Sequence, residues 1–152
     1  MSEFNNLKLD NQLCFALYGA TNAITRLYRE LLKDYDLTYP QYLVLLVLWQ
    51  QDGVPVKTLS ERLKLDTGTL SPLIKRLEKN GFIVRKRSEV DERMVHVHLT
   101  QHAKAIEPAV ANIQNQVACH TNLNNHDFFE LLNRLNKLAE DLVDRDRLKV
   151  AS

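Results

Sequence analysis

The two cysteines carry the most reactive side chains of this 152-residue chain: Cys14 near the start and Cys119 in the last third. A cysteine thiolate attacks peroxides and binds soft metal ions. Two cysteines are too few for a disulfide framework, and a separation of 105 positions does not fit a zinc-ligand pair. Spacing alone therefore leaves open whether they are reactive thiols or buried, inert residues, which is the commoner case.

Tyrosines follow Cys14 at two informative distances. Tyr18 comes four residues later, so on a helix the two side chains share a face and can touch. Tyr28 comes 14 residues later, which is about 21 Å along a straight helix at 1.5 Å per residue. If Tyr28 contacts a Cys14 at all, we therefore expect that contact to cross a dimer interface.

The elements that position these residues follow from apolar periodicity and from turn signals. Apolar residues at three- and four-residue steps predict helices, alternation predicts strands, and Pro40, Gly53 and Gly81 mark breaks. We expect Thr58 to lie near the start of a helix as a cap, and Asp66 and Thr67 to cap the next one. The expected order is helices at 11–33, 40–51, 57–63 and 66–80, strands at 82–84 and 95–99 around a polar turn at 85–93, and helices at 101–121 and 127–147.

This order predicts a mainly α fold with a small β-hairpin wing, in which residues 40–99 form a winged helix-turn-helix. We expect one domain over residues 1–152. The outer segments, 10–34 and 101–147, carry apolar stripes that the small central module cannot cover. We therefore expect a homodimer held together by the N- and C-terminal helices.

Composition narrows the function classes. With 45% hydrophobic and 26% charged residues, the chain has enough apolar side chains for a core and enough charge to stay in solution. Its most apolar run, Tyr42–Trp49, is far shorter than the roughly 20 residues that span a bilayer, and Met1–Asp10 lacks a secretory signal. We expect a soluble, cytoplasmic protein without a membrane partner or cofactor. Residues 56–99 carry a net charge of +4 and the remainder −3, as expected of a nucleic-acid surface on a neutral scaffold.

The predicted helix at 66–80 has the two faces that a recognition helix needs. Its apolar side chains point inward, and its other face carries short hydroxyl side chains first and cations later. At the hairpin tip, Asp91 is expected to orient the guanidinium of Arg93 for a minor groove. The candidate DNA-binding residues are Lys57, Thr67, Thr69, Ser71, Pro72, Lys75, Arg76, Arg85, Arg87, Asp91 and Arg93.

The hairpin also carries a family resemblance. Asp91-Glu92-Arg93, followed by Val95, Val97, Leu99 and Thr100, resembles the D-x-R…L-T wing signature of the MarR family of dimeric regulators. The resemblance covers about residues 10 to 145. It implies a transcriptional repressor rather than an enzyme, and a dimer that reads a near-palindromic operator in double-stranded DNA.

Within that family, the segment 9–18 resembles the motif around the reactive cysteine of the organic hydroperoxide resistance regulators. This resemblance implies that Cys14 is oxidised, that Tyr18, Tyr28 and Tyr39 hold it, and that Cys119 is the resolving cysteine of the two-cysteine subgroup. Phenolic hydroxyls can donate hydrogen bonds to a thiolate and favour its ionised form. A disulfide between Cys14 and Cys119 of the partner subunit would then release the DNA.

Three alternatives stay open. A phenolic or drug-like ligand bound between the core helices could release the DNA instead, which would make Cys14 incidental. The same cysteine could serve a thiol peroxidase, although a basic hairpin has no purpose there. His96, His98 and His102 could sense a metal ion, but no carboxylate or thiol accompanies them at ligand spacing, so we expect no metal site.

Overall fold

The computed structural model describes the backbone of residues 3–150 and the side chains of residues 3–144. The chain divides into two compact units, Met1–Gln114 and Asn115–Ser152. The first unit contains α1 (Leu13–Leu32), α2 (Tyr39–Gln50), β1 (Val54–Pro55), α3 (Val56–Leu63), α4 (Thr67–Lys79), β2 (Ile83–Arg87), β3 (Val95–Leu99) and most of α5 (Gln101–His120). Short 3₁₀ turns at Asn5–Leu7, Leu9–Asn11 and Lys33–Tyr35 flank α1.

Local caps explain where the central helices begin and end. Thr38 and Gln41 form a reciprocal capping box at the start of α2. Asp66 caps α4 by accepting a hydrogen bond from the backbone N–H of Thr69 at 2.7 Å. Gly81 ends α4 with a φ of +79°, a conformation that glycine adopts without strain. The expected role of Thr58 is wrong, because Pro55 stands at the N-cap of α3 and no side chain caps that helix.

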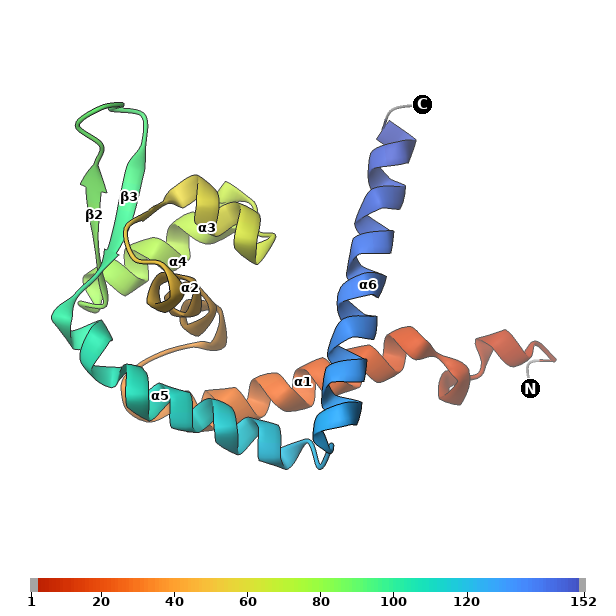
Figure 1. Cartoon of the computed structure of the whole chain (residues 1–152). Coiled ribbons are helices and arrows are strands. Elements are labelled where there is room, and N and C mark those ends of the chain that lie inside the picture. Colours follow the sequence, from red (N-terminus) through yellow and green to blue (C-terminus); the bar gives the residue numbers. More distant parts are fainter. Residues whose placement is uncertain (1–2, 151–152) are drawn as a thin grey trace. The chain divides into compact units, whose positions relative to one another are not determined.

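The small sheet has three antiparallel strands in the order β1–β3–β2. β2 continues to Arg87, which pairs with Val95, so the strand is longer than expected and the turn is shorter. The two-residue strand β1 was not anticipated. It pairs Val54 with Val97, and a pair of residues is too short for alternation to reveal. Figure 1 shows β2 and β3 as a projecting hairpin next to α2, α3 and α4.

The core of the first unit forms around α2, as the continuous apolar character of this helix predicted. The side chains of Leu45 and Leu48 are fully buried, as are those of Leu59, Leu70 and Phe82 from the neighbouring elements. The first part of α5 is joined to this core by a hydrogen bond of 3.1 Å from Trp49 Nε1 to the carbonyl of Ala103.

The second unit contains the end of α5 and α6 (Asn125–Val150). Asn124 caps α6, since its Oδ1 accepts the backbone N–H of Asp127 at 2.9 Å. The apolar residues Phe129, Leu131, Leu132, Leu135 and Leu142 are exposed along α6. None of the helices that the structure describes is both long and apolar enough to cross a membrane.

Candidate DNA interface and redox site

The helix-turn-helix consists of α3 and α4. The turn between them is closed at Lys64, which adopts a left-handed φ of 54°, and by a hydrogen bond of 3.1 Å from the Leu65 N–H to the carbonyl of Ser60. Leu70, Ile74 and Leu77 bury one face of α4, as predicted. On the other face Thr67, Thr69, Pro72, Lys75 and Arg76 are exposed and Ser71 is half-buried. The residues of this face are therefore free to meet a ligand as large as DNA.

An ion pair joins the end of α4 to the start of the wing. The Glu78 carboxylate accepts hydrogen bonds from the Arg85 backbone N–H at 2.9 Å, from its Nε at 3.1 Å and from its Nη2 at 2.8 Å. The hydrogen bonds from Arg85 lower the pKa of Glu78, and the same contact raises the pKa of Arg85. Arg85, a candidate DNA contact, is thus already paired with a carboxylate. Sequence reasoning missed Glu78, because no periodicity links a helix to the strand after it.

The loop of the wing, residues 88–94, is ordered by its own hydrogen bonds. Ser88 N–H donates to the carbonyl of Met94 at 2.8 Å, and Ser88 Oγ accepts the N–H groups of Val90 and Asp91. Asp91 Oδ1 accepts the backbone N–H of Arg93 at 3.0 Å. The expected contact between Asp91 and the Arg93 guanidinium is therefore corrected: Asp91 shapes the loop backbone. The side chains of Arg87 and Arg93 are exposed.

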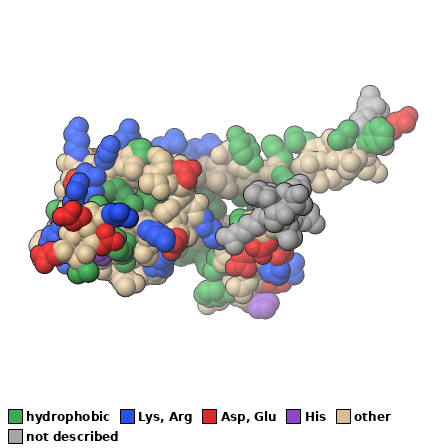
Figure 2. Space-filling model, turned by 90° about the horizontal axis from the view of Figure 1, so that it is seen from above, with side chains coloured by type: hydrophobic (Ala, Val, Ile, Leu, Met, Phe, Trp, Pro, Cys, Tyr) green, Lys and Arg blue, Asp and Glu red, His purple; other side chains and the backbone are tan. Residues whose placement is uncertain are grey.

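Residues 40–99 form the winged module, which comprises the winged helix-turn-helix. Figure 2 shows Lys and Arg side chains over it, together with acidic ones, and hydrophobic side chains along the N-terminal segment. Lys57, the remaining candidate, is exposed and lies 3.9 Å from Glu61. An ion pair this long and this exposed contributes little stability, so it leaves Lys57 available for other contacts.

Three of the candidate redox residues lie on α1: Cys14 and Tyr18 near its start, and Tyr28 near its end. Cys14 is the second residue of the helix, has a free thiol and is exposed. Tyr18, one turn later, is 66% exposed. Tyr28 lies in the last third of α1 and is 5% exposed. Because a single helix contains both, Cys14 and Tyr28 of one chain stand about 21 Å apart and cannot touch.

Tyr28 belongs to a cluster of three tyrosines. Its ring centroid lies 4.7 Å from that of Tyr39 and 5.3 Å from that of Tyr42. The hydroxyls of Tyr28 and Tyr42 both donate to Gln114 Oε1 on α5, at 2.5 and 3.2 Å. Burial raises the pKa of all three phenols, and most strongly that of Tyr28. The structure therefore brings Tyr28 and Tyr39 together, as a shared role requires. Sequence reasoning did not single out either Tyr42 or Gln114. Tyr42 lies in an apolar run that predicts only core packing, and no pattern links Gln114 to the tyrosines.

Cys119 belongs to the second unit. It is the penultimate residue of α5, its thiol is free and it is exposed. Its neighbour His120 is hydrogen-bonded through Nδ1 to the carbonyl of Gln116 at 2.7 Å.

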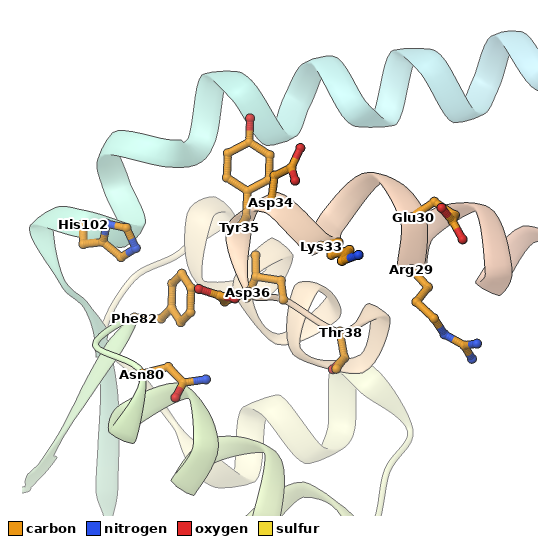
Figure 3. A pocket seen from close by; sticks show the side chains of 11 residues that line it. Arg29, Glu30, Lys33, Asp34, Tyr35, Asp36, Thr38, Asn80, Phe82 and His102 are labelled. Atoms are coloured by element: carbon orange, nitrogen blue, oxygen red, sulfur yellow. The ribbon is translucent and has the colours of Figure 1, made fainter.

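A separate cavity of about 900 Å³ opens in the first unit between the end of α1, the end of α4 and the start of α5. Figure 3 shows Phe82 and His102 on one side of it and Arg29 and Lys33 on the other. The rings of Phe82 and His102 are 5.1 Å apart. Its charged lining includes the carboxylates of Glu30, Asp34 and Asp36.

The helix-turn-helix packs one face into the core and exposes a polar recognition face, and an ordered wing that carries arginines follows it. These features define the protein as a winged-helix DNA-binding regulator. The family model described as transcriptional regulator SarA/Rot matches residues 26–109. The organic hydroperoxide resistance transcriptional regulator of Bacillus subtilis is 40% identical over 145 residues, 95% of this chain and 99% of that protein. The regulator MgrA of Staphylococcus aureus is 45% identical over 139 residues, 91% of this chain and 93% of MgrA.

Solved structures of similar regulators have the same fold. The structure of reduced AbfR bound to DNA has a TM-score of 0.76 and 30% identity, covering 89% of this chain and 94% of that one; AbfR is a protein of Staphylococcus epidermidis. AbfR has also been solved with its disulfide formed, with a TM-score of 0.65 and 33% identity over 86% of this chain and 92% of that one. The chain belongs to the SarA/Rot family and to the MarR-type winged-helix transcriptional regulators, as its wing signature predicted. It is a DNA-binding regulator and not an enzyme.

Proposed function

We propose that this protein is a homodimeric repressor that leaves its operator when an organic hydroperoxide oxidises Cys14. One observation carries the proposal: exposed Cys14 lies at the start of α1, whereas Tyr28 lies near the end of that helix and packs there against Tyr39 of α2. A two-fold axis makes every contact occur twice, with residue i of one subunit on residue j of the other. Two α1 helices that pair in antiparallel fashion would bring each Cys14 to the tyrosines of the other subunit.

Exposed apolar side chains support a dimer through the terminal helices. On the first turns of α1, Leu13, Phe15 and Tyr18 are 63%, 50% and 66% exposed. The apolar residues of α6 are exposed as well. Soluble monomers rarely leave such stripes in water, whereas a dimer interface would bury them.

The chemistry needs only the two thiols and the hydroperoxide. The Cys14 thiolate attacks the terminal peroxide oxygen, so that an S–O bond forms, the O–O bond breaks and the alkoxide leaves as an alcohol after taking up a proton. The thiol of Cys119 of the partner subunit then attacks the sulfenic sulfur, so that a disulfide forms and water leaves. The position of Cys14 in the first turn of α1 favours this reaction, because a helix N-terminus stabilises negative charge. Apolar neighbours such as Phe15 favour an organic hydroperoxide, whose hydrocarbon part gains from burial.

DNA recognition follows from the winged module. The exposed face of α4 suits a major groove, and Arg93 on the ordered loop suits the adjacent minor groove. A two-fold dimer presents two such modules and so reads a near-palindromic operator. A change at the interface between subunits alters the spacing of the two recognition helices, which couples oxidation to DNA release. That one relative is an organic hydroperoxide resistance regulator, and that another is solved both on DNA and with a disulfide, supports this proposal.

The cavity near Phe82 and His102 favours a second candidate, in which a bound ligand releases the DNA. Arg29 and Lys33 could pair with the carboxylate of an aromatic acid, while the two rings stack on it. Addition of an aromatic acid, without an oxidant, would then lower the affinity for DNA.

The deciding experiment treats reduced protein with one equivalent of cumene hydroperoxide and follows both non-reducing denaturing electrophoresis and DNA binding. Cys14→Ser and Cys119→Ser are run beside the wild type. We expect a disulfide-linked dimer and loss of DNA binding in the wild type, both reversed by a thiol reductant, and no linked dimer in either variant. A Cys14→Ser protein that still leaves DNA on treatment contradicts the proposal. Free thiols in the wild type, together with release by an aromatic acid, would support the ligand instead.

A further inference from the structure

We propose that Gln114 is a positioning residue of the peroxide sensor, which directs the hydroxyl proton of Tyr28 away from the reactive sulfur and leaves Tyr39 as the hydroxyl that donates to it. This inference rests on the proposed function, because it concerns how the tyrosines would act on Cys14 of the partner subunit. The family resemblance implies only that both tyrosines hold the cysteine, whereas this inference gives Tyr28 and Tyr39 different roles.

The proton of Tyr28 has an acceptor within its own chain. Gln114 Oε1 accepts the hydroxyls of both Tyr28 and Tyr42, and these contacts link α1, α2 and α5 inside the first unit. A phenol has one proton to donate and can accept with its oxygen. While Tyr28 donates to Gln114, its oxygen can therefore accept a hydrogen bond from a sulfenic acid or a hydroperoxide, but the hydroxyl cannot donate to a thiolate.

The hydroxyl of Tyr39 is different. Among the side chains that the structure describes, none makes a hydrogen bond to it, although its ring packs against those of Tyr28 and Tyr42. No unpaired polar side-chain atom is fully buried in this part of the chain, so the Tyr39 hydroxyl must be accessible from outside. It is an accessible donor without a hydrogen-bond partner among the described residues of its own chain.

The surroundings keep these roles separate. Tyr28 and Tyr42 are almost completely buried, and three rings with centroids 4.7 to 5.9 Å apart leave little room for a hydroxyl to move. Burial raises the pKa of each phenol, so near neutral pH all three act as neutral hydrogen-bonding groups. The direction of the proton, and not a change of charge, then decides which hydroxyl stabilises the thiolate.

The test measures the rate at which the Cys14 thiol is lost to cumene hydroperoxide, in full-length protein that carries Cys119→Ser so that the reaction stops before a disulfide. In this background, we expect Tyr39→Phe to slow the reaction about tenfold, as loss of a hydrogen bond to a charged group does, and Tyr28→Phe to slow it less than about twofold. Gln114→Met keeps the length of the side chain and removes the acceptor. In Gln114→Met, Tyr28→Phe is therefore expected to slow the reaction about tenfold.

Two matched variants separate proton direction from packing. Gln114→Glu keeps an acceptor for both hydroxyls. In this variant Tyr39→Phe should therefore still slow the loss of the Cys14 thiol more than Tyr28→Phe does. Tyr42→Phe removes the other donor to Gln114 and should change the rate less than about twofold. Thermal unfolding of each variant checks that the fold is retained.

Equal effects of Tyr28→Phe and Tyr39→Phe with Gln114 in place would overturn the inference. So would an effect of Tyr28→Phe that stays below about twofold in Gln114→Met. Both results leave the sensing function itself intact, because Cys14 still reacts. If the thiol of Cys14 is not lost even with all three tyrosines and Gln114 in place, the sensing function fails and this inference fails with it.

Discussion

Replacement of Arg93 by alanine removes an exposed positive charge from the loop between β2 and β3, once in each subunit of the proposed dimer. No carboxylate among the described side chains forms an ion pair with this guanidinium, and Asp91 accepts a hydrogen bond from the Arg93 backbone N–H instead. The whole charge of Arg93 is therefore available to DNA phosphates. Each neutralised phosphate contributes about 0.9 to the slope of log K against log salt, so two Arg93 side chains per dimer contribute about 1.8.

Between roughly 50 and 200 mM salt, this slope corresponds to about a 12-fold change in the affinity for DNA. The wild type should lose about 12-fold more affinity over that range than Arg93→Ala loses. Fluorescence anisotropy with a labelled operator, repeated over a salt series, measures both slopes. Arg134→Ala is the matched control, because Arg134 lies on α6 and its guanidinium is 2.8 Å from Glu130.

Glu78→Gln extends the test. It removes the carboxylate charge that now pairs with Arg85, so the salt dependence should become steeper if Arg85 then reaches a phosphate. A change in slope below about 0.5 for Arg93→Ala, or an equal change for Arg134→Ala, would refute the reasoning that the wing contributes phosphate contacts.

The remaining predictions concern stability, measured by denaturant unfolding. Gly53→Ala should lower the free energy of unfolding more than Gly81→Ala does. Both glycines have a positive φ, which destabilises an L-residue by about 1 to 2 kcal/mol, but only at Gly53 would a Cβ also lie 2.8 Å from His98 Cε1. The hydrogen bond from the backbone N–H of Thr69 lowers the pKa of Asp66, so the stability that this carboxylate contributes is present above its unfolded pKa and is lost as pH falls through the lower folded value; Asp66→Asn should make stability fall less steeply with falling pH. Burial raises the pKa of Tyr28 from 10.0, so stability should fall as pH rises above 10, and less steeply in Tyr28→Phe.

The helices were predictable because their signals are local. The buried helix α2 is apolar on every side, Asp66 directly precedes α4, and Gly81 directly follows it at a left-handed turn. Strand β3 was predicted at its observed bounds, since Val95, Val97 and Leu99 alternate with histidines. β2 was underestimated, because its exposed half consists of charged residues that take their strand conformation from pairing with β3.

For the redox site, the sequence determined the 14 positions between Cys14 and Tyr28, and with them the separation of these residues on one straight helix. It also determined, through apolar stripes on the terminal helices, that the chain exposes surface suited to a partner.

Only the tertiary structure decided which groups meet across the sequence. Glu78 meets Arg85 because Gly81 turns the chain back on itself, and Asp91 turns out to bind the backbone N–H of Arg93. Gln114 lies 86 positions from Tyr28, and only the packing of α5 on α1 and α2 brings them together. Periodicity records which face of an element is buried. It does not record which polar group on another element stands opposite, because a single hydrogen bond imposes no repeat on the sequence.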